Sequence, residues 1–70
     1  MGRLKNRLRE LRKSRGLTQE ELAARLRVSR QTVNAVERDK FHPSIDLALS
    51  MARFFSVPVE EIFRLEDEDG

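Results

Sequence analysis

The 70-residue sequence contains no cysteine, tryptophan or tyrosine, and it has only one histidine. The lack of cysteine excludes disulfide bonds and thiolate chemistry, and a lone histidine leaves no cluster that could bind a metal. No apolar run approaches the roughly 20 residues that cross a bilayer, and no apolar segment follows the basic N-terminus as in a signal peptide. We therefore expect a single cytoplasmic domain, without metal or membrane contact, that depends on side-chain packing for its stability.

Acidic residues are unevenly distributed along the chain. The net charge is +2, from 14 basic and 12 acidic residues, but residues 66–69 supply four of the acidic ones. Without them, 14 basic and 8 acidic residues give a net charge of +6. A basic surface suits a polyanionic partner, although a merely solvated surface explains the charge equally well. We predict an ordered basic domain over residues 1–65 and a disordered acidic tail over residues 66–70.

Two helix starts can be identified between Thr18 and Arg38. Thr18 and Glu21 have the spacing of a capping box, in which the threonine hydroxyl accepts from a free amide and the glutamate reaches back. Ser29 holds the equivalent position before a second helix that starts at Arg30. Apolar residues line one face of each predicted helix: Leu22, Ala23 and Leu26 in the first, then Val33 and Val36 in the second. Two short helices joined by so tight a turn form a helix-turn-helix.

The segment before this motif predicts another helix, over residues 3–13. Leu4, Leu8 and Leu11 recur at helical spacing within it, and basic residues fill the other faces. Gly16 follows, and we expect it to end the helix in a left-handed conformation.

The segment after the motif predicts two more helices. Ser44 caps a helix that continues to about Phe55, and its residues are apolar on nearly every side, so we expect burial on every side. A last short helix follows Pro58, a residue that is tolerated in a first helical turn. Its apolar face consists of Val59, Ile62 and Phe63. The fold class predicted from these segments is all-α, with five short helices.

The run TQEELAARLRVSRQTVNAVER, residues 18–38, resembles helix-turn-helix transcriptional regulators of the phage-repressor or xenobiotic-response-element type. The resemblance extends to both sides and covers roughly residues 3–63. It implies a lambda-repressor-like bundle of five helices, with the second helix across the DNA backbone and the third in the major groove. It also implies a partly buried ion pair between Arg12 and Glu37, at the end of the third helix.

Two positions depart from the pattern of this family. Arg27 and Asp39 stand where its members usually have glycine. A left-handed conformation costs arginine about 1 kcal/mol more than glycine, and aspartate tolerates that conformation better than most residues. We therefore expect the fold to be retained.

The outer face of the predicted third helix carries side chains that can bind bases. Because Val33 and Val36 point inward, Arg30, Gln31 and Asn34 project outward near the start of the helix. Arginine can clasp O6 and N7 of guanine, and glutamine or asparagine can clasp N6 and N7 of adenine. The predicted phosphate contacts are Gln19, Ser29, Thr32, Arg38 and Lys40. For the last three, ordinary capping or a solvated face is an equally good explanation.

The apolar surface of the predicted fourth helix exceeds what a small bundle can cover. One stripe suffices for the bundle: Ile45, Ala48, Leu49, Ala52 and Phe55. The surplus, together with the last helix, predicts a homodimer interface made of Leu47, Met51, Phe54, Val59, Ile62 and Phe63. Two-fold symmetry would place two third helices about 34 Å apart, one turn of DNA. The alternative is a monomer in which the last helix and the tail cover this surface.

These observations predict a sequence-specific transcriptional regulator that binds a palindromic operator in double-stranded DNA as a homodimer. An antitoxin-type interaction module that holds a toxin partner is the alternative, although the chain has little room for a separate toxin-binding segment. An enzyme is poorly supported, because the sequence offers no nucleophile–base pair and no glycine-rich phosphate loop. No cofactor and no small-molecule ligand are implied.

Overall fold

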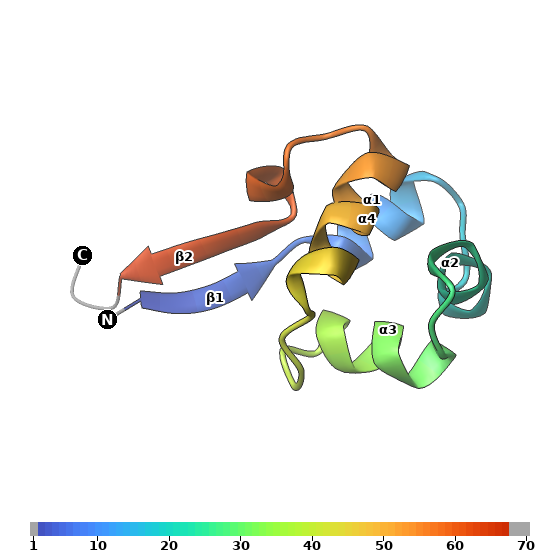
Figure 1. Ribbon diagram of the computed structural model, residues 1–70, viewed down its shortest axis with the longest axis horizontal. Coiled ribbons are helices and arrows are strands. Elements are labelled where there is room, and N and C mark those ends of the chain that lie inside the picture. Colours follow the sequence, from blue (N-terminus) through green and yellow to red (C-terminus); the bar gives the residue numbers. More distant parts are fainter. Residues whose placement is uncertain (1, 68–70) are drawn as a thin grey trace.

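The computed structural model describes residues 2–67, which form a helical body and a two-stranded sheet that projects from it (Figure 1). The elements in chain order are β1 (Gly2–Asn6), α1 (Leu8–Ser14), α2 (Gln19–Leu26), α3 (Arg30–Glu37), α4 (Ile45–Phe55), the short 3-10 helix η1 (Val59–Glu61) and β2 (Phe63–Asp67). The lambda-repressor-like arrangement is therefore present, but the described chain is mostly helical rather than all-α.

The two ends of the described chain pair with each other, which corrects the prediction of a helix over residues 3–13. β1 runs antiparallel to β2, and α1 begins only at Leu8. The side chain of Asn6 accepts from the amide of Leu8 at 3.0 Å, and the amide of Arg7 donates to the carbonyl of Ile62 at 2.8 Å. These bonds satisfy amides of the first helical turn and direct the preceding residues into the sheet.

The C-terminal segment also differs from its prediction. The expected last helix is only the 3-10 turn η1, and the chain then enters β2 at Phe63. Glu66 and Asp67, assigned to a disordered tail, belong to this strand, so that assignment is wrong for them. Residues 68–70 of the predicted tail lie outside the described residues.

The starts of α2, α3 and α4 agree with the sequence signals. Glu21 donates its amide to the Thr18 hydroxyl at 3.0 Å, and its carboxylate accepts from the Thr18 amide at 2.8 Å, which completes the capping box. Ser29 and Ser44 cap α3 and α4 with their hydroxyl groups. Three predicted positions have a left-handed backbone: Gly16 at φ 68°, Arg27 at φ 62° and Asp39 at φ 60°.

A single hydrophobic core joins the four α-helices to the residue before β2. Its buried members are Leu8, Leu22, Ala23, Leu26, Val33, Val36, Met51, Ala52, Phe55 and Ile62. Phe54 and Phe55 add an edge-to-face ring pair with centroids 5.0 Å apart. Helix α3 contributes Val33 and Val36 to this core, so its core contacts lie on one face and the opposite face points outward.

Helix α4 is buried on one side only, which corrects the expectation of burial all round. The side chain of Met51 is fully buried, whereas Ile45 is 78% exposed and Leu49 is 55% exposed. Ile45 and Leu49 are one turn apart on the same line of the helix, and the exposed Arg53 continues that line. Three short helices supply too little surface to enclose a fourth, so one apolar line stays in contact with solvent.

Candidate nucleic-acid interface

Helix α3 lies along one edge of the helical body, with α2 at one end and the sheet beyond the other (Figure 1). Val33 and Val36 are fully buried, and this fixes which face of α3 points outward. The side chains of Arg30 and Gln31 are exposed on that outward face, in the first turn after the Ser29 cap. The geometry therefore presents two long polar side chains side by side at the start of α3.

Asn34 and Gln19, predicted for different roles, contact each other. The side-chain Nδ2 of Asn34 donates to Gln19 Oε1 at 3.3 Å, and Gln19 Nε2 donates to Glu37 Oε1 at 3.1 Å. Both Asn34 and Gln19 are half-buried. This chain of hydrogen bonds fixes the start of α2 against the middle and end of α3, so the two helices present one rigid surface.

The predicted ion pair between Arg12 and Glu37 is present, and it extends this network, since Glu37 accepts from both Gln19 and Arg12. Arg12 Nε and Nη2 donate to the two carboxylate oxygens of Glu37 at 2.6 and 3.1 Å, and Nη1 donates to the carbonyl of Leu17 at 2.8 Å. The two side chains are only 10% and 3% exposed. The hydrogen bond to Glu37 raises the pKa of the Arg12 guanidinium, against the opposing effect of burial. A bidentate pair of hydrogen bonds therefore holds α1 to the end of α3.

The far end of α3 is held by a residue that the sequence did not single out. Asn6, the last residue of β1, donates from Nδ2 to the carbonyl of Val36 and to Asp39 Oδ1, both at 2.8 Å. Its Oδ1 accepts from the amide of Leu8. An asparagine two residues before an apolar helical run is a known turn signal, and it could have placed the helix start correctly.

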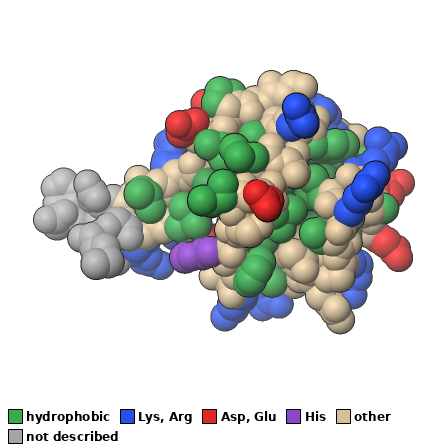
Figure 2. Space-filling model, in the orientation of Figure 1, with side chains coloured by type: hydrophobic (Ala, Val, Ile, Leu, Met, Phe, Trp, Pro, Cys, Tyr) green, Lys and Arg blue, Asp and Glu red, His purple; other side chains and the backbone are tan. Residues whose placement is uncertain are grey.

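The remaining predicted phosphate contacts surround α3. The hydroxyl groups of Ser29 and Thr32 are 3.0 Å apart, and Thr32 is half-buried. Arg38 and Lys40 are exposed just beyond the end of the helix. Figure 2 shows lysine and arginine side chains spread along the edge of the molecule that contains α3. The surface around α3 is therefore basic at both ends.

Two of the six predicted interface residues are not on the surface. Met51 is 0% exposed and Ile62 is 1% exposed, so the prediction that they contact a second copy is wrong. The other four are partly buried and pack against the core: Leu47, Phe54, Val59 and Phe63. For Met51 the pattern failed because α4 is apolar on so many sides that spacing alone does not tell which side faces the core.

Residues 2–67 form neither a metal site nor a membrane-spanning helix. No group of three or more histidine, cysteine, aspartate or glutamate side chains there could hold a metal ion. Within the same residues, no helix combines the length and the apolar character needed to cross a membrane.

Comparison with known proteins also identifies a helix-turn-helix protein. Residues 8–62 match a helix-turn-helix family model. An uncharacterized HTH-type transcriptional regulator of Methanocaldococcus jannaschii is 48% identical over 66 residues, which cover 94% of this chain and all of that protein. Another, of Methanothermobacter thermautotrophicus, is 52% identical over 64 residues, 90% of this chain and 91% of that protein. The structure of the restriction-modification controller protein C.AhdI of Aeromonas hydrophila superposes with a TM-score of 0.71 and 37% identity, covering 77% of this chain and 82% of C.AhdI.

Proposed function

Because the chain belongs to the helix-turn-helix family of DNA-binding transcriptional regulators, which are not enzymes, we propose that it binds a palindromic operator as a homodimer. The observation that carries the proposal is the pair of exposed side chains, Arg30 and Gln31, at the capped start of α3. They stand on a helix that buried contacts hold in place, and such preorganisation favours specific contacts to base edges.

The two classes of DNA contact are separated on this surface. Arg30 and Gln31 bind base edges in the major groove, and Asn34 joins them by sharing its amide between Gln19 and a base. The phosphate contacts surround α3: Ser29 and Thr32 at its start, Gln19 beside its middle and end, and Arg38 and Lys40 just beyond its end. The first group sets the preferred sequence, and the second sets the orientation and most of the salt dependence.

In the proposed dimer, the two copies contact each other through the solvent-exposed apolar residues of α4. Ile45 and Leu49 supply its most exposed large side chains, and Val59 and Phe63 supply the partly exposed ones that follow α4. Figure 2 shows hydrophobic side chains over α4 that continue towards the sheet. A monomer rarely leaves such a patch bare, and a two-fold contact there would pair two half-sites.

Selection of genomic fragments with the purified protein tests this function. The expected result is an inverted repeat whose half-sites lie about 10 base pairs apart, one helical turn, or a multiple of it. A collection of fragments that share no sequence would contradict base-specific binding. A single unrepeated motif would contradict the dimer and leave base recognition by α3 in place.

A further inference from the structure

The projecting sheet contains an arrangement of charge that its own stability does not explain. Lys5 of β1 lies directly opposite Arg64 of β2 in the strand register. Like charges in directly opposite positions destabilise an antiparallel pair, and a sheet of only two strands is marginally stable already. Among residues 2–67, neither side chain forms an ion pair, and the nearby Glu61 pairs with Arg7 at 3.6 Å. Lys5 and Arg64 therefore oppose each other across the strands without a direct ion pair among the described residues.

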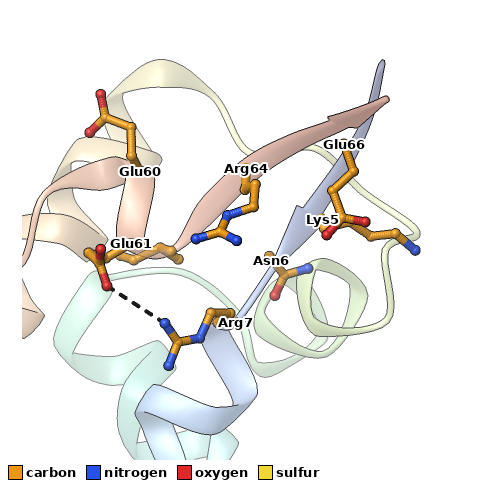
Figure 3. A pocket seen from close by; sticks show the side chains of 8 residues that line it. Lys5, Asn6, Arg7, Glu60, Glu61, Arg64 and Glu66 are labelled. Carbon is orange, nitrogen blue, oxygen red and sulfur yellow. Dashed lines mark ion pairs between the residues drawn. The ribbon is translucent and has the colours of Figure 1, made fainter. Parts of the chain in front are cut away.

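The two head groups point to different surroundings. Figure 3 shows the guanidinium of Arg64 directed towards Glu61, and the ammonium of Lys5 directed away from it. The hollow that Arg64 borders is lined by three glutamates and three cations, so its charges balance and it does not favour an anion: Glu60, Glu61, Glu66, Lys5, Arg7 and Arg64. Lys5 also borders a second hollow, between β1 and the loop that follows α3, which has a different composition.

That second hollow is basic. It is lined by Arg3, Leu4, Lys5, Asp39 and His42. Asp39 is its single acidic residue, and the carboxylate already accepts a hydrogen bond from Asn6. The composition therefore suits an anion, and the anion that the family binds is the phosphate of DNA.

The position of this hollow relative to α3 is fixed. Asn6, the neighbour of Lys5, is bonded to the carbonyl of Val36 in the last turn of α3. Arg38 and Lys40 are exposed and flank Asp39 in the sequence, so two further cations follow the last turn of α3. When a helix lies in the major groove, phosphate backbones pass both of its ends, and the hollow lies beside the segment that follows the end of α3.

We propose that the hollow between β1 and the loop after α3 binds a backbone phosphate of operator DNA through Lys5, so that the N-terminal strand is part of the DNA interface. The inference rests on the proposed function, and it extends the contact beyond the helix-turn-helix. A bound phosphate also neutralises the repulsion between Lys5 and Arg64. DNA binding therefore stabilises the sheet as well as the complex.

The register offers a matched pair of variants, Lys5→Gln and Arg64→Gln. Each removes one cation and the same cross-strand repulsion, so both are expected to keep at least the wild-type denaturation midpoint. Affinity for a selected duplex is measured between about 50 and 200 mM salt. For Lys5→Gln, the slope of log affinity against log salt becomes shallower by about 0.9 for each bound protomer. The affinity at moderate salt falls about two- to fivefold for specific and unrelated duplexes alike, as for an exposed charge pair.

Arg64→Gln and Lys5→Arg are expected to keep the wild-type slope, because Arg64 does not line the second hollow and Lys5→Arg preserves the charge. A wild-type slope for Lys5→Gln would overturn the proposal. Equal losses of affinity in Lys5→Gln and Arg64→Gln would overturn it too. Such losses would show that affinity depends on the net charge of the protein and not on a contact made by Lys5. A wild type that binds no duplex would overturn the proposed function itself, and this site with it.

Discussion

The helical body and the projecting sheet are stabilised in different ways. The body has a core with seven large side chains that are less than 2% exposed, and a buried bidentate ion pair joins its first and third helices. The sheet has no core of its own: Leu65 is 72% exposed, and two cations oppose each other across the strands. Stability therefore resides in the body, and the sheet contributes surface and charge whose effect appears when a partner binds.

The largest expected effect is the loss of the buried pair. Arg12→Ala leaves the carboxylate of Glu37 buried without its cation, and removing one partner of such a pair costs about 3 to 5 kcal/mol of stability. The residual exposure of Arg12 lowers that figure towards its lower limit. Arg9→Ala, an exposed position of the same helix, is the control and should change stability by less than about 0.5 kcal/mol. Denaturant midpoints measure both, and equal midpoints would contradict a structural role for Arg12.

The second effect concerns the apolar line of α4. Leu49→Glu places a charge where the proposed dimer buries a leucine from each copy, and each burial contributes about 1.5 to 3 kcal/mol. Ser50→Glu adds the same charge at the adjacent exposed position and is the control. Sedimentation at micromolar concentration should give a dimer for the wild type and Ser50→Glu, and a monomer for Leu49→Glu. A monomeric wild type without DNA would exclude a constitutive dimer.

The body contains the segments whose structure could be predicted from sequence. The starts of α2 and α3 depend on residues at most three positions apart, such as Thr18 and Glu21, so local chemistry determines them. The residue types that could bind bases and phosphates also follow from the helical spacing. The hydrogen bond between Asn34 and Gln19 does not, because it depends on how closely α2 and α3 pack.

The sheet could not be predicted, for a physical reason. Leu4 fits the helical spacing with Leu8 and equally fits a strand, and its partner Leu65 lies at the other end of the chain. Only the tertiary fold brings the two together. For α4, a helix with apolar residues on most sides, the pattern did not distinguish Met51, which is buried, from Leu49, which is exposed. The candidate site was therefore predictable in chemistry and only partly in geometry.

The third effect acts on binding and leaves the body intact. Arg30→Ala and Gln31→Ala remove exposed side chains, so stability should stay within about 0.5 kcal/mol of the wild type. Each should cost about 1 to 3 kcal/mol of affinity at particular base positions and relax the preference there. Gln19→Ala should instead weaken binding to every sequence. Binding-site selection with each variant measures this, and a uniform loss for all three would exclude α3 as the base-reading element.

The smallest expected effect tests the connection between body and sheet. Asn6→Ala removes the bonds to Val36 and Asp39 and the cap on the amide of Leu8, at a cost of about 1 to 2 kcal/mol. Most of that loss should be local, because the core is untouched and the sheet is marginal alone. Hydrogen exchange should therefore accelerate for amides of β1 and β2 much more than for those of α2 and α3. Lys5→Gln, at the neighbouring position, is the control and should leave exchange in the sheet unchanged or slower. Equal acceleration throughout the chain would mean that body and sheet unfold as one unit, and that stability does not differ between them as the packing indicates.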